Sequence, residues 1–245
     1  MLRLTAVLAL VTVALGTIAA AEAPIGGVTI GTTIAALVHD SGFPSTVEST
    51  DSGNRFVFPG AVAYTNDDGV VVAAETAGGS VSVDIDGKPR TFAIGTYTSG
   101  QADLELATVA EYAGDGVRTY RLSDERELVL LFDRPSRTLL RVAYGQRGQL
   151  ARLGLVSGDD TIKAVPYKAP KMRATARADG TGSRITIVKL DIARTGDVKN
   201  VTVVASSGDA AFDAGVTKEL MTDRFTPATL GGRAIGATIF RELRH

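Results

Sequence analysis

The chain has 245 residues, of which 44% are hydrophobic and 22% charged, a composition typical of a folded protein. Its 26 basic and 27 acidic residues nearly cancel, and no stretch gathers Lys and Arg, so the charge pattern argues against nucleic acid as a partner. There is no cysteine, which excludes disulfides, thiolate nucleophiles, zinc–thiolate sites and a lipidated lipoprotein cysteine.

The N-terminus has the layout of an export signal. Arg3 precedes an uncharged run from Leu4 to Ala21 that ends in small residues. Ala19 and Ala21 occupy the positions of an A-x-A cleavage site, which predicts a signal peptide over residues 1–21. We therefore expect a periplasmic or secreted protein. Because about 18 apolar residues are the lower limit for crossing a bilayer, an uncleaved inner-membrane anchor facing the periplasm is the alternative.

Residues 24–156 predict a mostly-β domain, because short alternating runs are separated by turn residues. Its first half has a short apolar segment at 33–42, followed by strand-like runs at 57–64 and 70–75. The tetrapeptide Asn66–Gly69 predicts the hairpin turn before the last of these runs.

The second half of this region repeats the same layout. An apolar segment at 101–116 leads into three strand-like runs, with a turn predicted at Asp133–Ser136. Two explanations fit this layout. One is a duplication with repeats at 30–88 and 94–150, and the other is chance similarity within a Gly-, Val- and Thr-rich domain. The layout resembles the helix-then-sheet repeats of BamE-like and β-lactamase-inhibitor-like periplasmic modules.

Residues 157–183 separate this region from the C-terminal part. They are polar, contain two prolines and three glycines and show neither structural period, so we expect a linker. Residues 184–245 then predict an α+β domain in β-β-α-β order, with an antiparallel sheet and the helix on one face. In its first strand, 185–192, the alternation of residues places one set on the same face: Thr186, Val188, Leu190 and Ile192.

The rest of this domain follows from local signals. A turn at Arg194–Asp197 leads into a second strand over 198–205. The oxygens of Ser206–Asp209 suit a helix N-cap. The expected helix carries an apolar stripe of Ala211, Phe212, Val216 and Leu220. Pro227 lies beyond the end of the helix, Gly231-Gly232 makes a turn, and Ala234–Leu243 is the third strand.

Several motifs in this order resemble the C-terminal domain of TonB energy transducers over residues 171–245. They are Ser206-Ser207-Gly208, Phe212-Asp213, Arg224-Phe225-Thr226-Pro227-Ala228, and Gly231-Gly232-Arg233 before a final strand with Phe240. The resemblance implies a periplasmic domain that adds a short extended segment of an outer-membrane receptor to its sheet edge. We expect the edge strand Ala234–Leu243 to make this contact. The predicted partner-binding residues are Arg233, Ile235, Ala237, Ile239 and Arg241.

Three features depart from the family pattern. Val165-Pro166-Tyr167 has the residues of the family's tyrosine-proline element in the wrong order. The segment Leu4–Ala21 lacks the serine and histidine with which the family's anchor contacts the inner-membrane motor proteins, and no proline-rich spacer follows. We therefore expect a TonB-like binding domain fused to another exported domain, without energy transduction.

Catalytic patterns are weak. The chain has two histidines and no G-x-S-x-G elbow, which argues against a Ser-His-Asp triad. Asp-Ser-Gly occurs at Asp40–Gly42 and Asp51–Gly53, a motif that aspartic proteases use in pairs, but we interpret both as turns. Gly42 would cap a helix. The pairs Asp67-Asp68 and Asp159-Asp160 also fit turns. No catalytic residue, metal site or cofactor is predicted.

The leading interpretation is an exported, non-enzymatic protein that binds another protein in the cell envelope, with a TonB-dependent outer-membrane receptor as one candidate partner. Two alternatives stay open. In the first, the N-terminal region is a ligand-binding or inhibitory module, and the TonB-like domain serves as a dimerisation appendage, which would make a homodimer. In the second, the protein is an envelope hydrolase.

Overall fold

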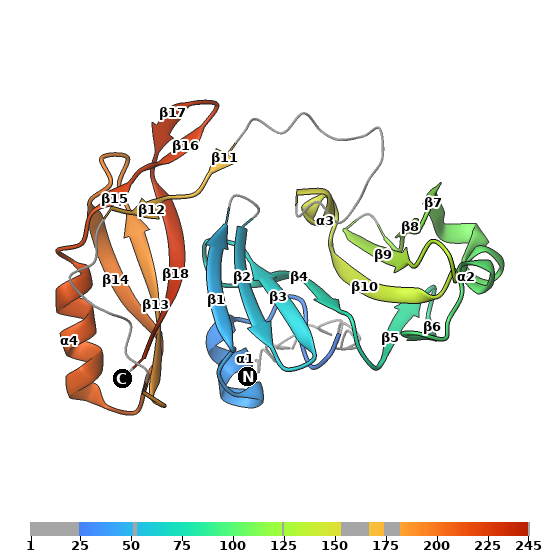
Figure 1. The fold of residues 1–245 in the computed structure, drawn as a ribbon, viewed down its shortest axis with the longest axis horizontal. Coiled ribbons are helices and arrows are strands. Elements are labelled where there is room, and N and C mark those ends of the chain that lie inside the picture. The colour runs from blue at the N-terminus through green and yellow to red at the C-terminus, as the bar shows by residue number, and fades with distance from the viewer. Residues whose placement is uncertain (1–24, 51–52, 124, 153–166, 174–181, 245) are drawn as a thin grey trace, which may run out of the picture.

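The computed structural model describes residues 25–50, 53–123, 125–152, 167–173 and 182–244 (Figure 1). Within them the protein is mainly β, with few helices and with antiparallel sheets, which confirms the α+β class. The predicted signal peptide, Asp51 and Ser52, Asp159 and Asp160, and most of the predicted linker lie outside the described residues.

The N-terminal part begins with a short helix and a four-stranded meander. Helix α1 (Ile34–Ser41) is capped by Thr33, whose hydroxyl accepts a hydrogen bond from the amide of Ala36. It ends at Gly42, whose φ of 80° and bond to the Val38 carbonyl confirm the predicted helix end. Four antiparallel strands follow: β1 (Thr46–Thr50), β2 (Gly53–Phe58), β3 (Ala61–Thr65) and β4 (Val71–Thr76).

A hairpin, a second helix and a second meander come next. The hairpin joins β5 (Ser80–Ile85) to β6 (Lys88–Ala93). Helix α2 (Ser99–Glu105) starts in a capping box formed by Thr98 and Gln101. A 3-10 turn, η1 (Ala107–Val109), leads into the remaining elements: β7 (Ala110–Gly114), β8 (Val117–Arg121), β9 (Arg126–Phe132), β10 (Leu139–Gln146) and α3 (Gln149–Arg152).

The two meanders form one eight-stranded antiparallel sheet. Its strand order is β1-β2-β3-β4-β10-β9-β8-β7, so the last strands of the two meanders pair at the centre. One face packs on the helices: Ile34, Leu37 and Val38 of α1 and Ala102 of α2, with Leu106 after it, belong to its buried cluster. Both predicted turns, at Asn66–Gly69 and Asp133–Ser136, are confirmed between β3 and β4 and between β9 and β10.

The C-terminal part packs a helix on a three-stranded sheet. Strand β13 (Ile185–Ile192) lies between β14 (Val198–Ala205) and β18 (Ala237–Arg244), and both pairs are antiparallel. Helix α4 (Ala210–Leu220) buries Val216 and Leu220 in one cluster with Val188, Leu190 and Ile192 of β13. The apolar face expected for this strand therefore lies under the helix.

Five short strands complete the C-terminal part, and two of them come from the predicted linker. Strand β11 (Tyr167–Lys168) pairs with β16 (Ala228–Leu230), which pairs with β17 (Arg233–Ile235). Strand β12 (Lys171–Met172) pairs with β15 (Phe225–Thr226). The described end of the predicted linker is thus joined to the C-terminal part by strand pairing.

Two runs that alternation predicts as single strands are interrupted. The run 57–64 turns at Pro59-Gly60, where Gly60 has a φ of 87°, so it divides into β2 and β3. The run 234–243 breaks at Gly236: β17 before it pairs with β16, whereas β18 after it pairs with β13. In both cases strand-like residues lie on both sides of the break, so periodicity alone does not show where the strand ends.

The two parts share a hydrophobic core. Ile187 of β13 and Phe240 of β18 are 0% and 1% exposed, and both belong to the cluster built by α1, α2 and the eight-stranded sheet. They lie on the face of the C-terminal sheet opposite α4. The Phe240 ring meets the Phe56 ring edge to face, with centroids 5.3 Å apart. The predicted domains are therefore packed directly against each other.

Gly196, in the turn between β13 and β14, lies against the backbone of Phe225. Its φ is 90°, and a Cβ there would overlap the Phe225 carbonyl oxygen. We expect Gly196→Ala to lower the free energy of unfolding by about 1–3 kcal/mol more than Gly208→Ala. Gly208 is the matched control, because its φ is 83° but its Cβ would meet nothing within 4 Å. Urea denaturation measures the difference, and equal losses would contradict the overlap.

Candidate functional site

The outer edge of β18 faces the N-terminal sheet. Strand β18 pairs with β13 along one edge, and its other edge lies beside β1 (Figure 1). There the amide of Phe240 donates to the Ser49 hydroxyl at 3.0 Å. That hydroxyl donates in turn to Asn54 Oδ1 at 2.7 Å. The middle of the outer edge is therefore held by a side chain of the N-terminal part.

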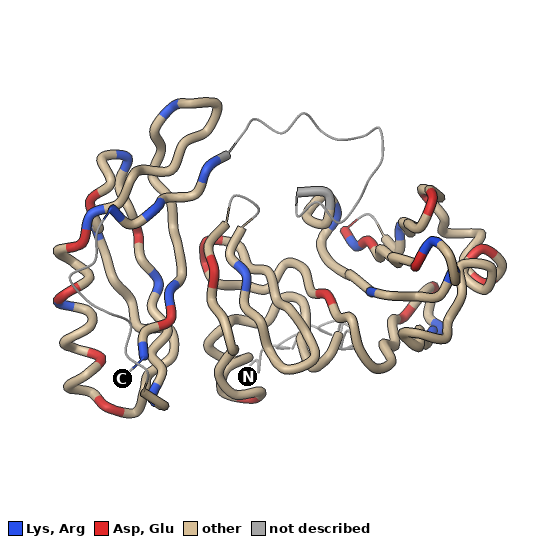
Figure 2. The backbone as a smooth tube through the Cα atoms, in the orientation of Figure 1, with Lys and Arg blue, Asp and Glu red and all other residues tan. Residues whose placement is uncertain are grey.

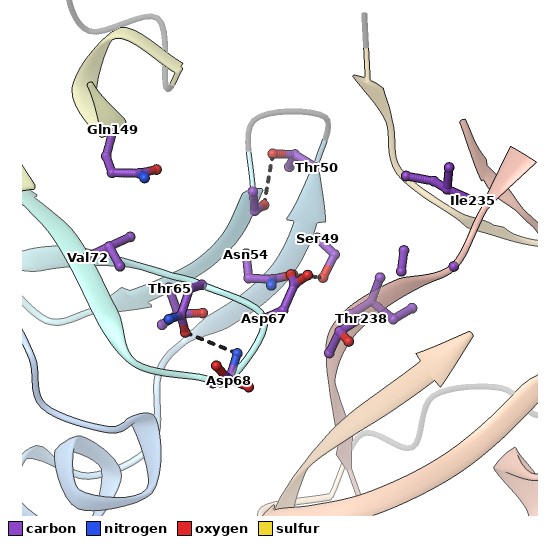
Figure 3. A pocket seen from close by; sticks show the side chains of 15 residues that line it. Ser49, Thr50, Asn54, Thr65, Asp67, Asp68, Val72, Gln149, Ile235 and Thr238 are labelled. Atoms are coloured by element: carbon purple, nitrogen blue, oxygen red, sulfur yellow. Dashed lines mark hydrogen bonds between the residues drawn. The ribbon is translucent and has the colours of Figure 1, made fainter. Parts of the chain in front are cut away.

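A cleft of about 370 Å³ opens beside this contact (Figure 3). One wall is the first half of β18 together with Ile235 and Gly236, and the other comes from β1, β2 and the turn between β3 and β4. The polar side chains that line it include Ser49, Asn54, Thr65, Asp67, Asp68 and Thr238. Both parts of the chain are needed to form it.

The main chain of Thr238 faces the cleft. In an antiparallel strand, the amide and carbonyl of every second residue point to the same side. Because the Phe240 amide points to Ser49, the main-chain groups of Thr238, two residues earlier in the same strand, point the same way. Strand β13 is the one strand that pairs with β18 in the described part of the chain. Among the described residues, no strand pairs with the edge of β18 at Thr238.

The opposite wall is acidic and contains an unpartnered hydroxyl. Asn66 fixes the turn, because its Oδ1 accepts hydrogen bonds from the amides of Asp68 and Val70, at 3.0 and 2.9 Å. Asp67 and Asp68 both line the cleft. Thr65, which lines the cleft and is 6% exposed, has a buried hydroxyl oxygen with no hydrogen-bond partner.

The five predicted partner-binding residues fall in different places. Arg233 is exposed on β17, and Ile235 and Ala237 line the cleft. Ile239 also borders the cleft, but its side chain is 4% exposed and packs in the core under α4. Arg241 points to the same face of the sheet, with a guanidinium nitrogen 3.6 Å from the Met172 sulfur. Their role as partner contacts stays a prediction.

The cleft residues of the N-terminal part were not predicted as a site. The turn at Asn66–Gly69 was recognised from its residue types, but no local pattern shows that it lies opposite Thr238. Ser49 and Thr65 likewise carry no motif. Periodicity did indicate an edge strand here, and that was the one available signal.

The motif residues around α4 have structural partners. Asp213 is 8% exposed and accepts hydrogen bonds from the hydroxyls of Thr186, Ser206 and Ser207 and from the Ser207 amide. Burial alone would raise the pKa of this carboxyl, but the hydrogen bonds from Ser206, Thr186 and Ser207 outweigh it and lower the pKa. Asp213 therefore joins α4 to β13 through Thr186 and to the segment after β14 through Ser206 and Ser207.

The motifs after α4 also hold the fold. Phe225 is 2% exposed in the core, which confirms its expected packing, while Arg224 is exposed and pairs with Asp197 at 3.1 Å. Gly231 and Gly232 have φ values of 56° and 80° in the turn between β16 and β17. Phe225, Arg224 and the two glycines of this turn thus have structural roles in the domain.

A second hollow, of about 310 Å³, lies near β2, β3, β4 and β10 and is lined by Arg55, Glu75 and Arg141. Its charges are paired with each other and their neighbours. Tyr64 donates to Glu75 at 2.8 Å, Arg141 bonds Glu75 at 3.2 Å, and Arg55 bonds Glu48 at 2.9 Å. Burial, with Glu75 nearby, raises the pKa of Tyr64 to about 12. These groups satisfy one another and point to no ligand.

The candidate catalytic motif is only partly described. Asp40 lies in the last turn of α1 and contacts His39 at 2.8 Å, and both side chains are exposed. The helix-end interpretation of Asp40–Gly42 is therefore confirmed, whereas Asp51 lies outside the described residues. Within the described ranges, no three His, Asp or Glu side chains are placed to share a metal ion. No helix in those ranges is both long and apolar enough to cross a bilayer.

Comparisons with known proteins give one family and distant structures. No curated protein matches the chain. A cysteine-rich secretory protein from Staphylococcus aureus is 17% identical, with a TM-score of 0.34 over 58% of this chain and 54% of that one. An extracellular protein containing an SCP domain from Bacillus anthracis is also 17% identical, with a TM-score of 0.39 over 55% and 52%. The chain thus spans about half the length of each.

The family described as Gram-negative bacterial TonB protein C-terminal matches residues 170–243. The match begins inside the predicted linker, just before β12, which pairs with β15. It contains β13, β14, α4 and all of β18 except Arg244. Residues 170–243 are therefore a segment of the TonB C-terminal domain type, as the sequence motifs predict.

Proposed function

We propose that this protein is an exported cell-envelope protein that holds an extended segment of a partner protein by strand addition at the outer edge of β18. The observation that carries this proposal is the outer edge of β18 at Thr238, which lines the cleft and which no strand of the described ranges covers. An incoming strand satisfies the main-chain groups of such an edge with the same hydrogen bonds that join strands in a sheet. The family match favours a TonB-dependent outer-membrane receptor as the partner.

A periplasmic location and a binding role, not catalysis, belong to this proposal. The run Leu4–Ala21 supports export, and the family of residues 170–243 supports the periplasm. The absent serine and histidine in that run, and the absent spacer, support holding a partner without energy transduction. In this proposal the partner binds at the edge of β18, and the N-terminal sheet lies beside that edge.

The N-terminal part is the second candidate, as a ligand-binding or inhibitory module with the C-terminal part serving dimerisation. The sheet face opposite α1 and α2 favours it, because partly buried Val62, Val117 and Leu131 pack there around a small cluster with Tyr64. Such apolar side chains on a sheet face are typical of protein-contact surfaces.

The hydrogen bonds of the N-terminal part support the duplication. The Gly31 amide bonds the Val71 carbonyl at 2.8 Å, and the Gly95 amide bonds the Leu139 carbonyl at 2.8 Å. Thr33 and Thr98 cap the two helices and form equivalent isolated bridges, to Val70 and Thr138. We infer that the two helix-and-meander units are repeats of one ancestral unit.

Site-specific photocrosslinking in the cell envelope tests which surface binds. We expect a photoreactive residue at Thr238 to capture an envelope protein, and one at the exposed Lys218 of α4 to capture none. Capture from Val62 and not from Thr238 would instead support the N-terminal surface. Truncating the chain is a poorer test, because it removes Ile187 and Phe240 from the shared core.

A further inference from the structure

We propose that one end of the C-terminal part, formed by β11, β12 and the β16–β17 hairpin, docks on an anionic lipid surface. Its exposed lysine and arginine side chains would bind the phosphate headgroups. This inference goes beyond the proposed function, because none of its residues belongs to β18. It gives the protein a second contact surface, which meets a membrane and not a protein partner.

The charge of the chain is divided unevenly between its two parts. Residues 25–152 contain 11 basic and 16 acidic residues, whereas residues 167–245 contain 13 basic and 8 acidic. The two excesses nearly cancel in the net charge of -1, so the protein as a whole has no general attraction to anions. An anionic surface attracts the C-terminal part and repels the N-terminal part, which favours one orientation of the protein on that surface.

Strand pairing brings two basic segments together. Residues 161–178 contain five Lys or Arg and no Asp or Glu, and residues 224–241 contain three Arg and no Asp or Glu. The charges are spread singly along each segment, so neither stands out in the sequence. In the fold, β11 pairs with β16 and β12 pairs with β15, which joins the two segments. Figure 2 shows Lys and Arg on β11, β12 and β17, and these strands contain no Asp or Glu.

Four of these side chains are exposed: Lys168, Lys171, Arg173 and Arg233. Within the described part of the chain, none of the four has an ion pair or a side-chain hydrogen bond. They are spread along β11, β12 and β17 and are not gathered around one point. This arrangement suits a layer of headgroups better than a single small anion. Arg233, predicted from the sequence as a partner contact, is assigned here to lipid.

The β16–β17 hairpin gives this surface an apolar tip. It extends past the end of the three-stranded sheet of the C-terminal part (Figure 1). Leu230 and Arg233 pair across the turn, so their side chains share one face, and Leu230 is 43% exposed. Lys168 pairs with Thr229, the residue before Leu230. A single exposed leucine is common on proteins, but one at a hairpin tip beside two cations suits the boundary between headgroups and acyl chains.

Vesicle co-sedimentation tests this docking. The protein used is residues 22–245, which keep every described element, because the apolar run Leu4–Ala21 would enter a bilayer by itself. We expect it to pellet with phosphatidylcholine vesicles that contain about 30% phosphatidylglycerol, but not with pure phosphatidylcholine. About 0.5 M NaCl should release it, because salt screens the attraction between exposed charges.

Two double variants with the same change in charge locate the contact. Lys168→Gln/Arg233→Gln should lower the vesicle partition coefficient at least ~10-fold, because each Lys or Arg near an anionic surface contributes roughly fivefold. Lys199→Gln/Lys218→Gln is the matched control, since both lysines are exposed but lie on β14 and α4. The control should keep the coefficient within about twofold of the parent.

A fluorescent reporter tests whether the hairpin tip enters the lipid. The chain contains no tryptophan, so an introduced one reports only its own surroundings. The emission of Leu230→Trp should shift to shorter wavelength when the anionic vesicles are added. The emission of Met221→Trp should not shift, because Met221 is 41% exposed but lies at the end of α4.

Three results would each overturn the docking surface. They are no pelleting with phosphatidylglycerol at low salt, equal losses in the two double variants, and a shift from Met221→Trp but not from Leu230→Trp. Binding of polyglutamate that needs Lys168 and Arg233, without binding of vesicles, would assign the surface to an acidic protein and overturn the lipid. None of these results involves Thr238, so each leaves strand addition at β18 to its own test.

Discussion

Replacing Phe240 with alanine is expected to lower the free energy of unfolding by about 3–5 kcal/mol. The ring is 1% exposed and packs edge to face on Phe56, 5.3 Å away between centroids. A Cβ on Gly69 would lie 3.2 Å from the same ring, which shows how closely the turn after β3 approaches it. The loss should appear in urea denaturation followed by circular dichroism.

The size of this loss reports on how the two parts of the chain are joined. Phe240 belongs to the C-terminal sheet, but its ring packs on Phe56 of the N-terminal part. A double-mutant cycle with Phe56→Ala should give a coupling of about 0.5–1.5 kcal/mol. Leu230→Ala is the control, since Leu230 is 43% exposed and its truncation should cost within about 0.5 kcal/mol. A Phe240→Ala loss as small as that of the control would mean that the parts separate in solution.

Local signals in the C-terminal part predicted most of its elements. The alternation over 185–192, the turn at Arg194–Asp197 and the cap at Asp209 each depend on neighbours within a few residues, and all three are present. The change of partner at Gly236 could not be predicted this way. It depends on where β16 and β13 lie, and both are distant in sequence.

The hairpin of β5 and β6 in the N-terminal part has a strong local sequence signal. Asp86-Gly87 lies between alternating apolar residues, which is the strongest short hairpin signal, and it joins β5 to β6. Both residues have positive φ, 54° and 74°, as a type I′ turn requires. By contrast, β1 (Thr46–Thr50) is rich in polar residues, and its pairing with β2 stabilises it more than its own pattern does.

The sequence indicated the strand that forms one wall of the cleft, but not the residues of the other wall. The expected third strand indicated an edge of the sheet, and its residues Ile235 and Ala237 line the cleft. Their role as partner contacts stays a prediction. The other wall comes from residues about 170 positions away in the sequence, such as Asp68 opposite Thr238, and no spacing rule reaches so far. Ser49 is a serine in a polar strand, and only the packed structure shows that it meets Phe240.

Removing the Asp213 carboxylate is expected to be comparably costly. In Asp213→Ala, the hydroxyls of Thr186, Ser206 and Ser207 lose their acceptor inside the fold. A buried donor left without a partner costs about 1–3 kcal/mol, and water can reach part of this group, so we expect a total loss of about 3–4 kcal/mol. Urea denaturation at neutral pH measures it. Asp133→Asn, in the turn between β9 and β10, is the control.

The pH dependence of the same site has a defined sign. The pKa of Asp213 is lowered in the folded state, where the hydrogen bonds from Ser206, Thr186 and Ser207 outweigh burial, which acts in the opposite direction. Its ionised form therefore stabilises the fold fully above the pKa of an unfolded aspartate, about 3.9. This contribution is lost as the pH falls through the lower folded pKa.

Asp213→Asn isolates this contribution, because asparagine keeps the shape of the side chain but does not titrate. The difference in unfolding free energy between the parent and this variant should be constant from pH 7 to about pH 5 and shrink below pH ~4. A difference that grows toward acid would require a raised pKa and contradict the network. Because Ser206 and Ser207 are motif residues of the TonB-type segment, a confirmed loss would explain that motif as part of the network that holds α4 through Asp213.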